Sequence, residues 1–548
     1  MTVSTTDVAG VLARAIDYAA AFSLEAPVPG GVIAVVGLDG EIASAPWGMA
    51  DLAAGVAMSV EHRFEIGSIS KVVTAALVHQ LVDEGLIDLD RPVVDMLPWL
   101  SFGTPEAPIT PRHLLSHTAG LVLGADSIPD ELAQVWSMRD LTRSGEPGER
   151  FHYSNLGYMT LGVLAVAVTG ESLASLVSSR VLGPVGAGSA LGAVTHADRA
   201  SMAVGHWPLH DDRPWVPGDP VTAATWFEVA SADGNVAASA AELGCFASWL
   251  LGDGSPVLTS ASFDALVTPW APGGEDVHTW GATPSAESSR YGLGVNVESI
   301  SGHHCVTHGG GMVGYATFLL ADRDAGLGVV VLTNGSGEHP AAHVIARVVH
   351  RMLLDPSWEP PSASGVVRGV ELGRSLLGRF ADASPDVPVL TVALDDDGAV
   401  AVSSGDATGR LLRTWGSRYV TDHPDLRTFP LTPASHTWRW GPRVLRAVPT
   451  TPRAVDPRLE AYVGHYRSWS PWFTNLRIVA RDGGLALIAP VGVEAPGDDQ
   501  DLVEVADGVF RIGLDPWLPE RLVVGPVVDG VCISLVRDGC PYSRTPTP

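Results

Sequence analysis

The chain has almost no lysine. Its 548 residues carry 34 Lys and Arg side chains in total, and Lys71, in the stretch EIGSISKVV, is the only lysine in the sequence. Arginine therefore serves at every other basic position, where a guanidinium keeps its charge at any ordinary pH. A lysine retained at one position indicates a site that needs an amine able to lose its proton.

Ser68 precedes Lys71 by three residues, a spacing that places two side chains on the same face of a helix. A hydroxyl beside a neutral amine is an activated nucleophile. Serine is common in this chain, so the spacing alone is weak evidence, and the solitary lysine gives it weight. We therefore predict that Ser68 is a nucleophile and that Lys71 accepts or relays its proton.

Cysteine and long apolar runs are also scarce. The four cysteines have neither zinc-ligand nor redox spacing and read as reduced, buried thiols. The first 22 residues read as an amphipathic helix, because no basic stretch precedes a long apolar run as in a signal peptide. No segment approaches the length of apolar sequence that a membrane span needs. Together these features predict a cytoplasmic protein.

The chain has far fewer basic residues than acidic ones, 34 against 61, and its formal net charge is −27. This charge argues against nucleic acids and anionic membranes as partners. The motifs of common cofactor sites are missing as well. A P-loop needs Gly-Lys, and the glycines of GGGMVG (309–314) precede a strand where a dinucleotide fingerprint needs a helix. We expect no cofactor, and a small molecule or short peptide as substrate, with the oligomeric state left open.

Three histidines lie close together, His303, His304 and His308, but no carboxylate is near them in the sequence. We therefore expect no metal site there. His117 follows Ser116 directly, and adjacent side chains rarely face each other, so we expect a structural role for His117 and no Ser–His dyad.

The length predicts more than one domain. Residues 1–354 show strand signals near both ends, including a hairpin around Asp39-Gly40, and helix signals between them, such as 68–84. That order predicts an α+β catalytic domain with one antiparallel sheet flanked by helices.

A linker rich in proline and serine is expected at 355–366. Strand and turn signals dominate beyond it, in two stretches with an acidic Gly turn each, Asp397-Gly398 and Asp482-Gly483. We predict two small antiparallel β-barrel-like domains, at 367–448 and 449–548.

Three motifs occur in order along the first region: SISK (68–71), YSN (153–155) and HGGG (308–311). Together they resemble the S-x-x-K, Y-x-N and K/H-x-G motifs of the serine β-lactamase and penicillin-binding-protein superfamily. The resemblance is strongest to its class C-type branch, which includes esterases and D-aminopeptidases, and it covers residues of about 28–350. It implies a β-lactamase/transpeptidase-like fold.

The resemblance also implies a role for each matching residue. Ser68 attacks a carbonyl carbon, Lys71 takes or relays the proton, and Tyr153 shares the base role and later protonates the leaving group. Asn155 holds the substrate amide. The backbone N–H groups of Ser68 and Gly311 form the oxyanion hole, which a helix beginning at Ser68 would reinforce.

His308 stands where many members of that family carry lysine, and Gly309 and Gly310 would let the backbone approach the substrate closely. A largely neutral histidine holds a substrate carboxylate less firmly than a lysine does. This favours esterase, amidase or aminopeptidase chemistry over β-lactam hydrolysis or carboxypeptidase activity.

The sequence therefore predicts a serine hydrolase that acts through an acyl-enzyme on an amide or ester of a small peptide-like substrate, similar to D-aminopeptidases and esterases. Two alternatives stay open. One is an acyl transferase, such as a nonribosomal peptide cyclase of the penicillin-binding-protein type. The other is a ligand sensor that is acylated without turnover.

Overall fold

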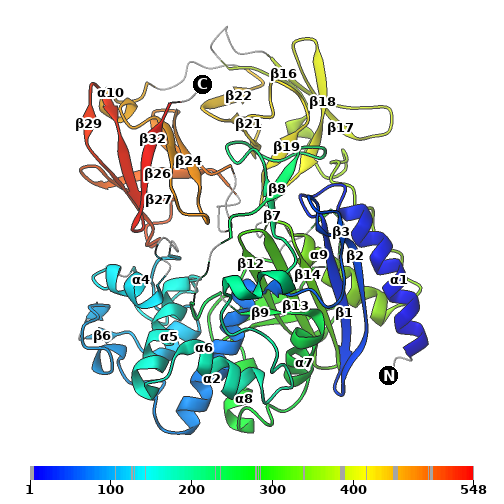
Figure 1. The fold of residues 1–548 in the computed structure, drawn as a ribbon. Helices are drawn as coiled ribbons and strands as arrows, with labels where there is room; N and C mark the ends of the chain where they lie inside the picture. Colours follow the sequence, from blue (N-terminus) through cyan, green and yellow to red (C-terminus); the bar gives the residue numbers. More distant parts are fainter. Residues whose placement is uncertain are drawn as a thin grey trace. The chain divides into compact units, whose positions relative to one another are not determined.

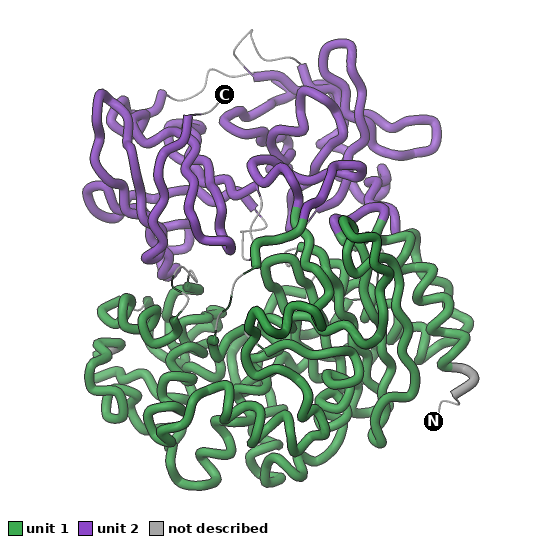
Figure 2. The backbone as a smooth tube through the Cα atoms, in the orientation of Figure 1, with its two compact units in different colours: residues 1–23, 28–207, 223–362 green, residues 24–27, 208–222, 363–548 purple. Residues whose placement is uncertain are grey.

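The structure is a computed structural model of the chain. It describes residues 5–104, 106–124, 128, 130–141, 144–226, 228, 230–234, 236–277, 280–281, 283, 285–336, 340–382, 389–414, 416–448, 454–490, 493 and 498–546. These residues divide into two compact units, which Figure 2 shows in separate colours. Unit 1 comprises 1–23, 28–207 and 223–362, and unit 2 comprises 24–27, 208–222 and 363–548.

Unit 1 is organised around an eight-stranded antiparallel sheet with the order β10-β11-β12-β13-β14-β1-β2-β3 (Figure 1). Its N-terminal hairpin therefore pairs with strands from the end of the unit, as strand signals at both ends predict. The strands are β1 (Gly30–Gly37), β2 (Gly40–Asp51), β3 (Val56–Ala57), β10 (Ser288–Tyr291), β11 (Asn296–Ile300), β12 (His303–Met312), β13 (Tyr315–Asp322) and β14 (Leu327–Thr333).

Helices cover both faces of this sheet. Helix α9 (Ala341–Leu354) packs on the face that carries Phe318, whose ring lies 4.3 Å from that of His343. Helix α1 (Thr5–Phe22) lies beside α9. Helix α7 (Ala240–Leu251) packs on the opposite face, and it begins with the Ser239/Glu242 capping box that its sequence encodes.

Helix α2 (Ser70–Asp83) carries Lys71 and lies deep in unit 1. Two details differ from the expected helix over 68–84. Ser68 lies in a 3-10 turn, η1 (Gly67–Ile69), that leads into α2. The helix is also buried on nearly all sides, because further helices, among them α5 (Asn155–Thr169), α8 (Ser260–Val267) and the segment Val177–Leu182, surround it.

The remaining helices are short. Four cover parts of unit 1: α3 (Pro111–Leu115), α4 (Glu131–Ser137), α6 (Leu173–Leu176) and the 3-10 helix η4 (His196–Ser201). No single helix among the described residues is long and apolar enough to span a membrane. Helix α5 and the segment 173–182 together have the length and composition of a membrane span, but the chain bends by 85° between them.

Unit 2 contains two antiparallel β structures. In the first, eight strands follow one another from β15 to β22, and reciprocal backbone hydrogen bonds of 2.9 Å between Ala381 and Arg446 nearly close the sheet. Its strands are β15 (Gly378–Phe380), β16 (Leu390–Leu394), β17 (Val400–Ser404), β18 (Ala407–Arg413), β19 (Tyr419–Thr421), β20 (Leu431–Ala434), β21 (Thr437–Trp440) and β22 (Arg443–Arg446).

The second is a closed eight-stranded barrel. Its strands are β23 (Gly464–Arg467), β24 (Asn475–Arg481), β25 (Gly484–Ile488), β26 (Gln500–Ala506), β27 (Val509–Ile512), β28 (Arg521–Val524), β31 (Ser534–Arg537) and β32 (Cys540–Thr545). The predicted turn at Asp482-Gly483 joins β24 to β25, with positive φ at both residues. The predicted fold class is thus confirmed, while the domain boundaries at 354, 366 and 448 stay a prediction.

Residues 208–222 interrupt unit 1 in the sequence and form part of unit 2. Residues 208–222 leave the first unit and are held by ion pairs to residues much later in the chain. The Asp211 carboxylate accepts hydrogen bonds from both terminal guanidinium nitrogens of Arg467, at 2.6 and 3.0 Å, and Asp219 forms an ion pair with Arg427. Unit 2 is therefore assembled from three separate pieces of chain.

Candidate active site

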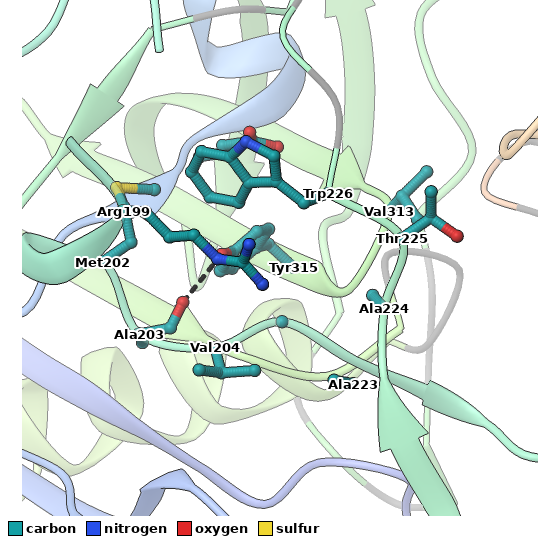
Figure 3. A pocket seen from close by; sticks show the side chains of 12 residues that line it. Arg199, Met202, Ala203, Val204, Ala223, Ala224, Thr225, Trp226, Val313 and Tyr315 are labelled. Carbon is teal, nitrogen blue, oxygen red and sulfur yellow. Dashed lines mark hydrogen bonds between the residues drawn. The ribbon is translucent and has the colours of Figure 1, made fainter. Parts of the chain in front are cut away.

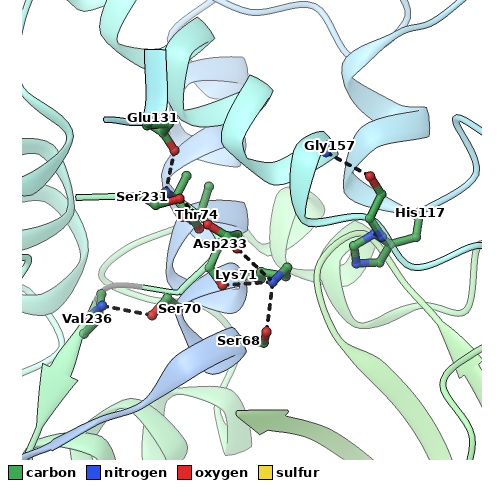
Figure 4. Close-up of polar contacts among 12 residues, drawn as sticks. Ser68, Ser70, Lys71, Thr74, His117, Glu131, Gly157, Ser231, Asp233 and Val236 are labelled. Carbon is green, nitrogen blue, oxygen red and sulfur yellow. Dashed lines mark hydrogen bonds and ion pairs between the residues drawn. The ribbon is translucent and has the colours of Figure 1, made fainter. Parts of the chain in front are cut away.

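The predicted nucleophile and amine lie together. Lys71 Nζ and Ser68 Oγ form a hydrogen bond of 2.9 Å (Figure 4). The Lys71 side chain is fully buried, and Ser68 is half-buried. Because η1 continues directly into α2, the positive end of the helix dipole lies at Ser68, where it favours negative charge.

Asp233 is a partner of Lys71 that sequence reasoning missed. Its backbone oxygen accepts a hydrogen bond of 2.9 Å from Lys71 Nζ, and its carboxylate oxygen Oδ2 lies 3.9 Å from the same nitrogen. A carboxylate at this distance favours the charged ammonium form of the lysine. The structure thus adds a group that opposes the neutral amine expected from the sequence, and any proton acceptance by Lys71 works against it.

The segment that carries Asp233 is tied down by buried polar contacts. Ser231 Oγ donates to the Asp233 carboxylate, and Thr74 Oγ1 donates to the Ala232 oxygen at 2.6 Å. The Ala232 N–H donates to Glu131 at 2.5 Å, and burial raises the pKa of that carboxyl well above its usual range. These contacts fix the position of the Asp233 carboxylate relative to α2.

Tyr153 and Asn155 lie on the other side of Lys71. The Tyr153 ring has its centre 4.9 Å from Lys71 Nζ, close enough for the ring face to attract a cation. Asn155 is buried and begins α5, but the helix cap is the Ser154 side chain, which accepts from the Gly157 N–H at 3.1 Å. Asn155 is therefore not needed as a cap, and its predicted role in substrate binding stays a prediction.

His117 supports the tyrosine. Its ring stacks on that of Tyr153 with centres 4.3 Å apart, and its Nδ1 accepts the Ser154 N–H at 3.0 Å. Burial and the charge of Lys71 lower the His117 pKa well below its usual range, so the ring is neutral. Ser116 Oγ donates to the backbone of Arg112 at 2.8 Å. Both contacts agree with a structural role and with no Ser–His dyad.

The nucleophile turn and β12 approach each other closely. A Cβ atom on Gly67 would lie 2.6 Å from the Gly311 nitrogen, so the two backbones that would form the oxyanion hole are adjacent. A Cβ on Gly310 would lie 1.9 Å from the Ile66 oxygen. Gly310 therefore makes room for the protein's own backbone, a reason that differs from the expected close approach to substrate. Contact of Gly309 or Gly310 with substrate stays a prediction.

His308 belongs to β12, and its side chain is fully buried. Its Nε2 forms a hydrogen bond of 2.9 Å with the Tyr291 hydroxyl, and its Nδ1 lies 2.6 Å from the Gly309 oxygen. Burial lowers the pKa of His308 to about 3, so the ring is neutral at ordinary pH. His308 is therefore a hydrogen-bonding group in the wall of the site, without the positive charge that a lysine would supply.

A small pocket of about 40 Å³ adjoins the two segments that carry Ser68 and Gly311 (Figure 3). Glu65 and Val313 line it, three residues before the serine and two after the glycine. Burial raises the pKa of Glu65 to about 8, so this carboxyl is protonated at neutral pH. Arg199 also lines this pocket, and its guanidinium lies 5.4 Å from the centre of the Trp226 ring.

Comparison with known proteins identifies the family. The model of the beta-lactamase family matches residues 14–352, and the chain therefore belongs to this family. Penicillin-binding protein 4 of Amycolatopsis lactamdurans is 31% identical over 330 residues, which cover 58% of this chain and 83% of that protein. A D-aminopeptidase of Cereibacter sphaeroides (strain ATCC 17023) is 28% identical over 337 residues, covering 57% of this chain and 58% of the enzyme.

A solved structure shares most of the fold. The octameric penicillin-binding protein homologue from Pyrococcus abyssi superposes with a TM-score of 0.58 at 19% identity, over 80% of this chain and 99% of its own. Family and fold together make this protein a serine hydrolase of the beta-lactamase-like family.

Proposed function

We propose that the protein hydrolyses an amide or ester bond of a small, peptide-like substrate through an acyl-enzyme on Ser68, with activity like that of a D-aminopeptidase. The observation that carries this proposal is the 2.9 Å hydrogen bond between Ser68 Oγ and the fully buried Lys71 Nζ. Burial favours the neutral form of an amine, and a neutral amine hydrogen-bonded to a hydroxyl can accept its proton.

In the proposed reaction Ser68 Oγ attacks the carbonyl carbon while its proton passes to Lys71. The oxyanion receives hydrogen bonds from the backbone N–H groups of Ser68 and Gly311, whose segments are adjacent. Lys71 and Tyr153 then deliver the proton to the leaving amine or alcohol. Water repeats the sequence on the acyl-enzyme and releases the acid.

The substrate class follows from the charges around the site. His308 is neutral and already bonded to Tyr291, so it offers no cation for the carboxylate of a penicillin or of a peptide C-terminus. We infer that the substrate has no carboxylate next to the bond that is cleaved, which fits an aminopeptidase or amidase substrate and the related D-aminopeptidase.

A fluorophosphonate label followed by mass mapping tests the nucleophile. We expect one adduct, on Ser68, and loss of both labelling and turnover in Ser68→Ala. Ser70→Ala is the matched control, because Ser70 lies two residues away and its Oγ accepts the Val236 N–H at 3.0 Å. Labelling of Ser70 or of any other serine would overturn the proposal.

A paired panel tests the substrate class: p-nitroanilides of D- and L-residues with free amino groups, their C-terminal-carboxylate peptide counterparts, and p-nitrophenyl esters. We expect D-residue anilides or simple esters to be cleaved and carboxylate-bearing substrates to be poor. A burst of product with no steady state would identify an acylated sensor. Acyl transfer to an added amine in preference to water would identify an acyl transferase. Either result would replace the hydrolase assignment.

A further inference from the structure

A second cluster of reactive side chains lies on the far face of the sheet. Cys305 on β12 and Asp322 on β13 are directly opposite each other in the ladder, and both are fully buried. His350 of α9 packs on them from above and is also buried. Because side chains alternate along a strand, Cys305 faces α9 while His308 faces the other way.

Three donor atoms of this cluster lie close together, and His303 contacts one of them, the Asp322 carboxylate. Asp322 Oδ2 lies 2.8 Å from His303 Nδ1 and 2.8 Å from His350 Nε2. Ligand atoms of Cys305, Asp322 and His350 all lie within 4.8 Å of one another. We call Cys305, Asp322, His350 and His303 the β12–α9 cluster. Its four side chains come from three elements, and each directs a nitrogen, oxygen or sulfur inward.

The Asp322 carboxylate is held in one orientation. Its Oδ1 accepts the backbone N–H groups of Asp324 and Ala325, at 3.1 and 2.9 Å, which fixes the turn between β13 and β14. Only Oδ2 is then directed at the imidazoles. Among the described residues no hydrogen bond engages the Cys305 thiol, so its sulfur is available as a ligand.

Charge balance favours a cation in the cluster. A fully buried carboxylate is costly unless a positive charge lies beside it. A neighbouring charged pair, Glu298 and Arg347, is already joined at 2.6 Å and cancels itself. A divalent ion with one carboxylate, one thiolate and two neutral imidazoles would leave the buried cluster with no net charge.

We propose that the β12–α9 cluster is a structural zinc site with Cys305, Asp322, His350 and His303 as its four ligands. Thiolate, carboxylate and imidazole are the ligands that zinc prefers, and four protein ligands leave no open position for catalysis. Tetrahedral zinc separates its ligand atoms by roughly 3.3–3.6 Å. His303 Nδ1 and His350 Nε2 would each move away from Asp322 Oδ2 by less than about 1 Å, and the Cys305 sulfur would move closer to the other donors.

Binding balances as a proton exchange. Zinc displaces the thiol proton of Cys305 to solvent and forms the Zn–S bond. His303 binds through Nδ1 and His350 through Nε2, each with its proton on the other ring nitrogen. His303 is one-third exposed and gives the ion its path of entry. The expectation of no metal near His303 rested on a missing carboxylate, and β13 supplies that carboxylate from 19 residues away.

Metal analysis and cobalt substitution test the site on the full-length protein. We expect close to one zinc per chain after purification without chelator, its loss to a strong chelator, and recovery on adding zinc. Co²⁺ should restore one site per chain with a sulfur-to-cobalt charge-transfer band in the near ultraviolet. That band should vanish in Cys305→Ser, while Cys245→Ser, at another free cysteine, should keep it.

His303→Ala is the variant least disruptive to folding, because the ring is partly exposed, and it should weaken Co²⁺ binding by at least about 100-fold, since loss of a ligand costs no less than loss of an outer partner. His304→Ala, one residue along and facing solvent, should bind as the parent does. Absence of saturable zinc and cobalt binding by the parent protein would overturn the proposal. Binding that is unchanged in both Cys305→Ser and His303→Ala would overturn it equally.

Discussion

The two faces of β12 bury ionisable side chains in opposite ways. On the active-site face His308 is stripped of charge, because burial lowers its pKa to about 3. Glu65, which lines a pocket together with Val313 just beyond the end of β12, is also uncharged at pH 7, with its pKa raised to about 8 by burial. On the α9 face Asp322 keeps its charge: hydrogen bonds from His350 and from backbone outweigh burial, and its pKa lies below the usual range.

This difference suits the two faces to different tasks. On the active-site face His308 and Glu65 are neutral, while Lys71 Nζ lies 3.9 Å from the Asp233 carboxylate. A charged carboxylate among soft and imidazole ligands instead suits a cation. The four predictions below test this contrast, beginning with the change of largest effect.

Lys71→Arg should slow labelling and turnover by at least about a thousandfold, a loss typical of a residue that acts together with the nucleophile. The guanidinium keeps the positive charge and cannot accept the Ser68 proton. The rate of fluorophosphonate labelling measures the effect directly. Retention of more than about a tenth of the parent rate would mean that only the charge at position 71 matters.

Asp322→Asn should destabilise the protein by about 3 kcal/mol, because it removes a buried charge whose imidazole partners remain. Thermal or denaturant unfolding measures this change. The labelling rate of the folded protein should stay within about twofold of the parent, since Asp322 lies on the face away from Ser68. A large loss of labelling at full folding would show that the two faces are coupled.

Glu65→Gln should change how stability depends on pH. The folded-state pKa of Glu65 is about 8 against an ordinary 4.5, so the parent loses stability as pH rises through this window, when the unfolded chain ionises first. The loss amounts to roughly 2–4 kcal/mol. The uncharged Gln should flatten the slope of unfolding free energy between pH 5 and about 8. Equal slopes in the two proteins would contradict a buried, protonated Glu65.

Asp233→Asn should move one limb of the pH profile of kcat/KM. Removing the carboxylate makes the neutral amine of Lys71 easier to form. If Lys71 accepts the Ser68 proton, as proposed, the acidic limb moves to lower pH. Movement of the alkaline limb alone would give the base role to Tyr153, with Lys71 as a permanent cation. Ser231→Ala, which removes only a partner of the carboxylate, should shift the same limb less.

The sequence predicted local structure well, because short-range chemistry encodes it. The hairpin around Asp39-Gly40 and the helix start at Ser239 follow from a turn dipeptide and a capping box, and both are present. The closed barrel and the nearly closed sheet follow from regular turns. The Ser68–Lys71 contact follows from a spacing of three residues.

Contacts between distant segments could not be predicted in this way. Asp233 reaches Lys71 across 162 residues, and nothing in its local sequence marks it as a partner. His350 reaches Asp322 only because α9 returns over the sheet. The reason for glycine at 310 also stayed hidden, because the atom that excludes a side chain there belongs to Ile66.

The route of residues 208–222 limits how this molecule can be dissected. A fragment ending at 354 keeps this excursion but loses Arg427 and Arg467, so Asp219 and Asp211 would each forfeit an arginine neighbour. The C-terminal fragment would lack the same stretch. Coexpression of both halves, or a graft of 208–222 onto the second, is therefore the sound way to study either unit in isolation.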